Sequence, residues 1–166
     1  MKETNSSFKK KAVSADSIEA VSGYNALSLD NQLCFSLYVC SKEIIKKYKP
    51  LLAPYHLTYT GYIVMMALWE EDNITVKELG KKLYLDSGTL TPMLKKLEAL
   101  HYIKRVRSHT DERNVYIQLT KKGIDLREEA VHIPDKLVCS MNLDLERGRQ
   151  LLEELHQMMR LFTNGS

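Results

Sequence analysis

Apolar residues recur at roughly helical spacing through most of the chain, which predicts a mainly helical protein. A first helix is expected to begin near Ser28 or Asp30, either of which can cap it, and to break or kink at Pro50. A second helix should begin at Thr58 and end in the acidic stretch 70–73. The residues of this second helix that we expect to face a core are Ile63, Met66, Ala67 and Trp69.

Two shorter helices follow, and each has a recognisable start. Thr75 is followed three residues later by Glu78, which forms a capping box, and Asp86 can cap the next helix. A tight turn through Tyr84 and Leu85 joins the two helices. The pattern therefore predicts a helix-turn-helix.

The pattern then changes to a period of two over 102–107 and 114–119, which predicts two β-strands joined by the polar loop 108–113. A β-hairpin directly after a helix-turn-helix is the layout of a winged helix. Thr120 can cap a fifth helix, kinked near Pro134, and a last helix is expected after residue 142. The last helix carries an apolar stripe formed by Leu151, Leu152, Leu155, Met158, Met159 and Phe162.

These elements divide the chain into four segments. Residues 1–27 are polar with few large apolar side chains, so we expect a tail that buries too little surface to order itself. Residues 28–57 form an N-terminal helical segment, 58–120 the winged helix-turn-helix and 121–166 the C-terminal helices. The expected fold class is mainly α with a small β-hairpin wing.

Positive charge is concentrated in the winged helix. The segment 75–122 contains eleven Lys and Arg against five Asp and Glu, whereas the whole chain has a net charge of only +3. Such an excess favours a local anionic partner, with a solvated basic face as the alternative.

Several other functions lack support in the sequence. The five His are scattered without metal-ligand spacing, the three Cys include no CxxC pair, and no phosphate-binding glycine loop or nucleophile elbow is present. We therefore expect no metal, no cofactor and no catalytic residue. The longest apolar run, 57–69, is too short and too polar to span a bilayer, and the N-terminus lacks the apolar region of a secretory signal. We expect a cytoplasmic protein without a membrane partner.

The start of the fourth helix suits contact with double-stranded DNA. Small polar residues near the N-terminus of a recognition helix reach base edges in the major groove, and lysines one turn further on reach phosphates. An ordinary capped helix with a polar face is the alternative. The residues that we expect to contact DNA are Asp86, Ser87, Gly88, Thr89, Thr91, Pro92, Lys95 and Lys96.

The hairpin favours the DNA interpretation. Arg105, Arg107 and Arg113 lie on its strands and loop, and a thin ribbon that ends in an arginine fits the minor groove of DNA. Asp111 and Glu112 are poorly suited to DNA contact. We expect one of these two carboxylates, Asp111 first, to pair with Arg105 or Arg113 and to fix the shape of the wing.

Several long motifs of the sequence resemble those of a known protein family. The segment 111–123, from Asp111-Glu112-Arg113 to Lys121-Lys122-Gly123, resembles the wing signature of the MarR family of bacterial repressors. The segment 85–98 is similar to the recognition helix of the OhrR branch, whose members sense organic hydroperoxides, and 31–38 and 47–52 also match that branch.

The resemblance covers about residues 29–162. It implies a homodimer of winged helices that binds a palindromic operator and represses transcription. The N-terminal segment 28–57 and the C-terminal helices 121–166 would form the dimer interface, and the N-terminal segment would also hold the sensor.

Cys34 is the candidate sensor. It lies about one turn into the first helix, where the helix dipole favours a thiolate; Tyr38 is one turn further on, and Asp30 would oppose ionisation. A lone cysteine on an apolar helix is otherwise a small buried hydrophobe. The resemblance implies instead that peroxide oxidises Cys34 and that Tyr38 and Tyr48 hydrogen-bond to it, Tyr48 from the opposite subunit.

The resemblance also implies a reaction in two steps. Peroxide converts Cys34 to a sulfenic acid, which a second thiol then captures, and the operator is released. Cys40 is a poor partner because six residues of helix rise by roughly 9 Å, beyond the roughly 7 Å Cα separation that a disulfide allows. Cys139 lies close to where the two-cysteine OhrR subclass keeps its resolving cysteine. A low-molecular-weight thiol is the alternative partner.

Three other functions are kept as hypotheses. One is a MarR-type repressor released by a small hydrophobic or phenolic ligand bound near Tyr38, Tyr48, Tyr59 and Trp69. Another is a thiol peroxidase, which would leave the basic winged helix unexplained. The third is a helical dimerisation module without a nucleic-acid partner.

Overall fold

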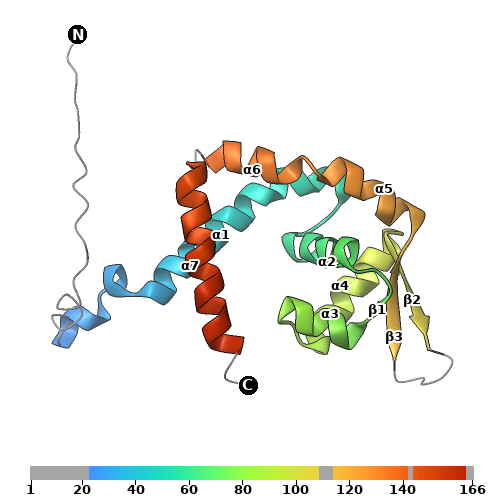
Figure 1. The fold of residues 1–166 in the computed structure, drawn as a ribbon, viewed down its shortest axis with the longest axis horizontal. Helices are drawn as coiled ribbons and strands as arrows, with labels where there is room; N and C mark the ends of the chain where they lie inside the picture. Colours follow the sequence, from blue (N-terminus) through green and yellow to red (C-terminus); the bar gives the residue numbers. More distant parts are fainter. Residues whose placement is uncertain (1–22, 109–113, 142–143, 164–166) are drawn as a thin grey trace, which may run out of the picture. The chain divides into compact units, whose positions relative to one another are not determined.

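The computed structural model describes residues 23–108, 114–141 and 144–163 of the chain. The chain forms two compact units, Met1–Glu43 and Ile44–Ser166, which are treated separately below. Figure 1 shows the order of the elements along the chain. None of the helices in the described ranges is long and apolar enough to cross a membrane.

The first helix begins later than the sequence predicts. Short 3-10 turns at Gly23–Leu27 and Leu29–Asn31 precede it, the first of them within the expected tail. The helix α1 then spans Leu33–Leu52, because Gln32 is still in an extended conformation. The predicted start at Ser28 or Asp30 is therefore wrong by one short turn.

The predicted break at Pro50 is also displaced. Pro50 lies inside the last turn of α1, where its missing N–H removes a single helical hydrogen bond. The chain turns away only after Leu52, through a 3-10 helix at Ala53–Tyr55 that ends with His56 in the left-handed conformation at φ 55°.

The central helix of the second unit is α2, Tyr59–Glu70, capped by Thr58, whose hydroxyl oxygen accepts the Gly61 N–H at 3.1 Å. Its predicted core face is confirmed in part: Ala67 is buried, and Met66 and Trp69 pack against the core while partly exposed, as Ile63 also is. A helix that is apolar on nearly all sides has little periodicity to indicate its inner face. The large side chains that α2 buries fully or almost fully are Tyr62, Val64, Met65 and Leu68.

The helix-turn-helix is confirmed. Its helices are α3, Val76–Leu83, and α4, Ser87–Ala99, and the Thr75–Glu78 capping box is present in full. Tyr84 ends α3 in the left-handed conformation at φ 55°. Gly80 allows the turn to close, because a Cβ there would lie 2.7 Å from the Leu85 carbonyl oxygen.

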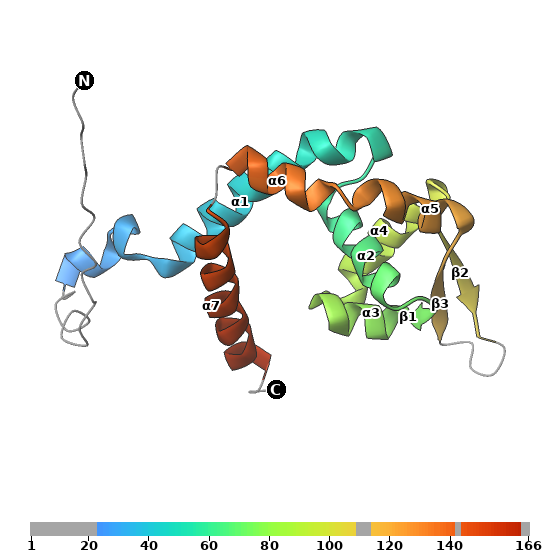
Figure 2. The same ribbon diagram turned by 45° about the horizontal axis from the view of Figure 1, so that its top comes forward.

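The wing is an antiparallel sheet with strand order β1-β3-β2. Strands β2, Ile103–Arg107, and β3, Val115–Leu119, form the predicted hairpin. The third strand, β1 at Ile74–Thr75, was not predicted, since two residues are too short to show alternation. The hairpin lies beside α3 and α4 at one end of the second unit in both views (Figures 1 and 2).

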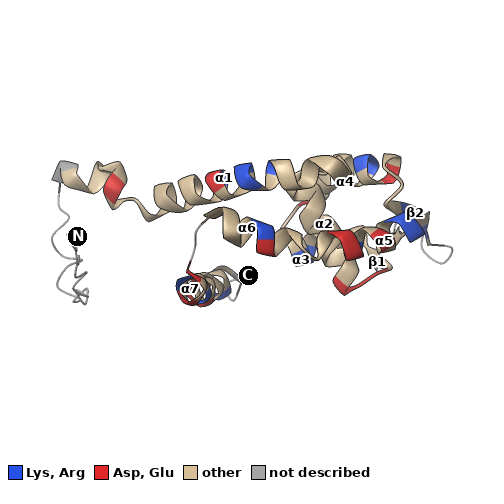
Figure 3. Cartoon of the chain, turned by 90° about the horizontal axis from the view of Figure 1, so that it is seen from above, with Lys and Arg blue, Asp and Glu red and all other residues tan. Residues whose placement is uncertain are grey.

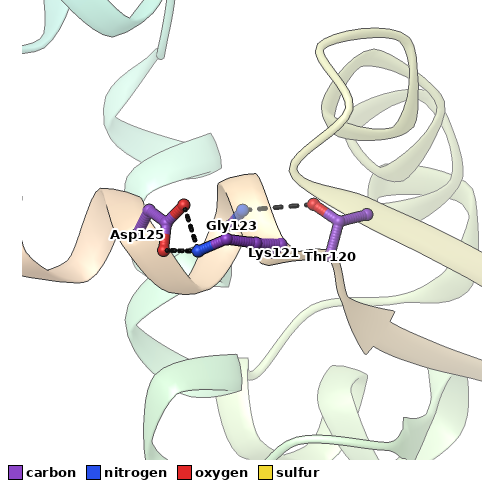
Figure 4. A network of polar contacts seen from close by, with 4 residues as sticks. All are labelled: Thr120, Lys121, Gly123 and Asp125. Atoms are coloured by element: carbon purple, nitrogen blue, oxygen red, sulfur yellow. Dashed lines mark hydrogen bonds and ion pairs between the residues drawn. The ribbon is translucent and has the colours of Figure 1, made fainter.

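Three helices complete the chain. The fifth predicted helix is two helices, α5 at Lys121–Ala130 and α6 at Ile133–Met141, so the chain breaks just before Pro134 instead of kinking there. Thr120 caps α5 by accepting the Gly123 N–H at 3.1 Å, and Lys121 pairs with Asp125 one turn further on at 3.0 Å (Figure 4). The last helix is α7, Leu145–Thr163, and none of its residues from Leu145 to Phe162 is buried.

Gly123 brings α5 against the base of the wing, and this close approach can be tested. A Cβ at Gly123 would lie 2.1 Å from the Tyr102 carbonyl oxygen, so Gly123→Ala should lower the free energy of unfolding in urea by about 2–3 kcal/mol. Gly61→Ala is the control, because its nearest contact would be 3.3 Å from a side-chain oxygen and alanine is the better helix former. Equal unfolding midpoints for the two variants would contradict the constraint.

Candidate functional site

Helix α4 has two distinct faces. Leu90, Leu94 and Leu97 are at most 1% exposed and face the core. All eight residues predicted to contact DNA, from Asp86 to Lys96, are exposed. Burial of the leucines therefore holds the polar side of α4 outward as one continuous surface.

Hydrogen bonds order the first turn of α4. The Asp86 carboxylate accepts both the Thr89 N–H at 2.9 Å and the Thr89 hydroxyl at 2.8 Å, and these bonds lower the pKa of Asp86. The Thr91 hydroxyl donates to the Ser87 carbonyl at 2.6 Å. Because both threonine protons are used inside the helix, Thr89 and Thr91 present hydroxyl lone pairs outward. Asp86 is thus the helix cap, a role that differs from direct base contact.

Basic side chains flank this polar face. Lys95 and Lys96 are exposed on α4, and Lys104 and Arg107 are exposed on β2. Figure 3 shows the basic residues of β2 in blue at the end of the second unit. This distribution agrees with the predicted positive excess of the winged helix.

A groove of about 310 Å³ separates the start of α3, the exposed side of α4 and the wing. Polar and charged side chains from all three elements line it. They are Thr75, Lys77, Ser87, Thr91, Arg105 and Asn114.

Arg105 has a partner on α4 that the sequence did not indicate. Its guanidinium group contacts the Glu98 carboxylate, with Nε at 2.8 Å and Nη2 at 2.6 Å from Oε2. Glu98 lies on α4, so the pair joins the recognition helix to the wing, whereas pairing with Asp111 or Glu112 would stay within the wing. Asp111, Glu112 and Arg113 lie outside the described residues.

Cys34 and Tyr38 belong to the first unit. Cys34 is the second residue of α1 and is exposed, in contrast to the buried hydrophobe that was the alternative. It thus lies in the first turn, where backbone N–H groups have no helical partner. Tyr38 is 61% exposed, and its ring faces the Lys42 ammonium group at 5.8 Å from the ring centre.

Tyr48 belongs to the second unit and is half-buried in an aromatic cluster. Its ring centre is 4.8 Å from that of Tyr59 and 5.9 Å from that of Tyr62, and the Tyr62 ring is 6.2 Å from Trp69. Burial, and then the neighbouring Tyr59 and Tyr62, raise the pKa of Tyr48 to about 12. The Trp69 indole N–H donates to the Gly123 carbonyl at 2.9 Å, which connects the cluster to the start of α5.

The other two cysteines are also exposed. Cys139 lies on α6 and Cys40 on α1. Lys47 is anchored near Cys139, because its ammonium group donates to the Ser140 carbonyl at 2.9 Å. Within the described ranges, no group of three or more His, Cys, Asp and Glu is arranged to hold a metal ion.

Two residues of the site were not found from the sequence. Gly80 shapes the turn before the recognition helix, and a glycine near the end of a short helix was the available signal. Glu98 gave no signal, because its partner Arg105 is seven residues away across a turn. Only folding brings these two side chains together.

A recognition helix with an outward polar face and a basic hairpin beside it define a winged-helix regulator. Residues 46–130 match the family model described as transcriptional regulator SarA/Rot. The chain belongs to this SarA/Rot family, whose fold is the MarR-like winged helix.

Individual relatives agree with the family. The chain is 47% identical over 131 residues to the transcriptional regulator SarZ of Staphylococcus epidermidis, covering 79% of this chain and 88% of SarZ. It is 47% identical over 141 residues to the organic hydroperoxide resistance transcriptional regulator of Bacillus subtilis, covering 81% and 96%.

Solved structures of AbfR from Staphylococcus epidermidis are also similar. Reduced AbfR bound to DNA matches with a TM-score of 0.67 at 36% identity, covering 81% of this chain and 93% of AbfR. A disulfide form of AbfR matches with a TM-score of 0.60 at 37% identity, covering 81% and 92%. The chain is thus a transcriptional regulator of the SarZ, OhrR and AbfR type.

The raised pKa of Tyr48 predicts a loss of stability in alkali. A tyrosine whose pKa rises from 10.0 to about 12 on folding stabilises the fold below the lower value and loses that contribution as the pH rises through the higher one. Urea unfolding midpoints should therefore fall between about pH 10 and pH 12, and less in Tyr48→Phe. Tyr38→Phe, which alters an exposed ring, should keep the fall of the wild type. An equal fall in Tyr48→Phe would contradict this role for burial.

Proposed function

We propose that this chain is a homodimeric repressor that binds a palindromic DNA operator when reduced and leaves it when an organic hydroperoxide oxidises Cys34. The observation that carries the proposal is an exposed cysteine in the first turn of α1, in a chain whose second unit presents a polar recognition helix beside a basic wing. The names of its relatives, a hydroperoxide resistance regulator and the DNA-bound AbfR, support the same combination.

In this proposal α4 enters the major groove of the operator. The hydroxyls of Ser87, Thr89 and Thr91 meet base edges, and Lys95 and Lys96 meet phosphates. The wing follows the adjacent backbone through Arg107 and reaches the minor groove through Arg113, a prediction from the sequence.

Exposed apolar side chains support a dimer. Leu33 on α1 is 64% exposed. On α7, Phe162 is 72% exposed and Leu152, in the same apolar stripe, is half-exposed. Exposed apolar side chains gathered along a helix, as on α1 and on α7, mark a site of association. Two copies related by a twofold axis present two recognition helices, which accounts for a palindromic operator.

The sensing reaction starts at Cys34. Its thiolate attacks the terminal oxygen of the hydroperoxide, so that an S–O bond forms, the O–O bond breaks and the released alkoxide takes a proton to become an alcohol. Hydrogen bonds from Tyr38 and from Tyr48 of the opposite subunit would hold the thiolate and would be lost on oxidation.

A second thiol then resolves the sulfenic acid. The thiol of Cys139 in the partner subunit forms the S–S bond, and the sulfenic oxygen leaves as water. The exposure of Cys139 in this chain and the existence of a disulfide form of AbfR support this route. A low-molecular-weight thiol would form a mixed disulfide with Cys34 in the same way, again with release of water.

A second candidate function is release by a small hydrophobic ligand. It rests on an apolar hollow of about 530 Å³ between the end of α1, α6 and α7, which is large enough for such a molecule. Tyr48, Leu137, Val138 and Leu152 are among the residues that line it. Release of DNA by a phenolic compound in a variant without cysteines would favour this function.

The sensor assignment predicts the behaviour of Cys34→Ser. This variant should bind the operator as the wild type does and keep its affinity after one equivalent of cumene hydroperoxide, whereas the wild type should lose at least about tenfold. Fluorescence anisotropy with a labelled operator duplex measures both. Cys40→Ser is the matched control, because it removes an exposed thiol from the same helix and should respond like the wild type. Peroxide-dependent release by Cys34→Ser would overturn the assignment.

The resolving step makes a separate prediction. After treatment with hydroperoxide, the wild type should run as a covalent dimer on a non-reducing gel, and Cys139→Ser should run as a monomer. Intact mass should then show whether a small thiol has added to Cys34 in the variant. A dimer band that persists in Cys139→Ser and disappears in Cys40→Ser would assign the bridge to Cys40 instead.

A further inference from the structure

We propose that Glu98 is a positioning residue for DNA recognition, which clamps Arg105 and thereby fixes the wing relative to the recognition helix. Arg105 thus serves as a strut inside the protein, and not as a phosphate contact. The inference rests on the proposed DNA-binding function and concerns how that function discriminates between sequences.

Three donors from Arg105 converge on the Glu98 carboxylate. The Arg105 backbone N–H donates to Oε1 at 3.2 Å, and its Nε and Nη2 lie 2.8 Å and 2.6 Å from Oε2. One carboxylate therefore holds both the main chain and the side chain of the same residue. This geometry restrains the position of the strand as well as the direction of the guanidinium group.

Arg105 lies on an edge strand of the sheet, so the contact with Glu98 affects how firmly that strand is held. In the order β1-β3-β2, strand β2 is an edge strand, so β3 holds it on one side only. The Arg105 N–H points away from β3 and is satisfied by Glu98, near the C-terminal end of α4. Without Glu98, the edge of the wing that faces α4 would lose this tie to the recognition helix.

Arg105 differs from the neighbouring basic residues because its charge is already paired with a carboxylate. The side chains of Arg105 and Glu98 are 33% and 35% exposed, so the pair is partly withdrawn from water. Hydrogen bonds from Arg105 hold the pKa of Glu98 below its usual range. A phosphate would have to displace this carboxylate to reach Arg105. Lys104 and Arg107 on either side are exposed and free of that competition in the described structure.

A clamp and a phosphate contact have different signatures in binding measurements. A lost phosphate contact weakens binding to all sequences alike and lowers the slope of log affinity against log salt by about 1. A loosened wing weakens binding to the preferred sequence, whose contacts need both α4 and the wing in register. It leaves binding to other sequences, and the number of phosphates neutralised, unchanged.

The test uses the full chain and two DNA probes. The first is a duplex that the wild type selects from a random-sequence pool, and the second is a scrambled duplex of equal length and composition. Arg105→Gln and Glu98→Gln should lower the ratio of the two affinities by about two- to fivefold. Neither variant should change the salt slope on the scrambled duplex by as much as the loss of a phosphate contact would.

Arg107→Gln is the matched control on the same strand. It should weaken binding to both duplexes alike and lower the salt slope. The charge-reversed double variant Glu98→Arg with Arg105→Glu restores the ion pair between the side chains. It does not restore the bond from the main-chain N–H of residue 105, because arginine has no acceptor, so it should recover only part of the discrimination. Urea unfolding of each variant identifies any that fails to fold, in which case the folded variants and the double variant decide.

The outcomes separate this inference from the function on which it rests. If Arg105→Gln behaves like Arg107→Gln, Arg105 is a phosphate contact and the clamp is overturned. If discrimination is unchanged in both single variants, the clamp is overturned while DNA binding stands. If the wild type selects no duplex at all, the proposed function fails, and the inference fails with it.

Discussion

Burial of one side of α4 is the constraint on which the rest of the second unit depends. Leu90, Leu94 and Leu97 are almost fully buried, and each buried leucine contributes about 1.5–3 kcal/mol relative to an exposed one. Rotation of the helix about its axis would expose them. The polar first turn is therefore held outward, and the helix has little freedom to rotate. A surface that must match the fixed spacing of base edges needs such a fixed orientation.

The same core places the wing. Strand β2 follows α4 after only a short turn, in which His101 adopts the left-handed conformation at φ 61°. Ile103 on β2 and Ile117 on β3 are buried with the leucines, so the hairpin is anchored at its base. Glu98 adds a polar tie at the edge of the strand. The recognition helix and the wing thus form one rigid surface instead of two independent ones.

The aromatic cluster links other parts of the second unit to this surface. It runs from Tyr48 near the end of α1 through Tyr62 to Trp69, whose indole donates to Gly123 at the start of α5. Gly123 in turn lies against the Tyr102 carbonyl beneath the wing. A residue that the resemblance assigns to sensing is therefore packed into the same core that holds the DNA-reading elements.

The sequence by itself determined the local elements of this protein and its class, a winged-helix regulator. Capping residues such as Thr75 and Asp86 act on neighbouring backbone groups, and the change of period at the wing follows from strand geometry, so both can be recognised in the order of residues alone. The exposed face of α4 could be predicted in the same way, because its leucines have helical spacing. Tertiary structure decided what depends on contacts between distant residues: the buried face of the uniformly apolar α2, the strand β1, the close approach at Gly123 and the pairing of Glu98 with Arg105. Residues far apart along the chain meet only when the core forms, and periodicity within one segment carries no information about such a meeting.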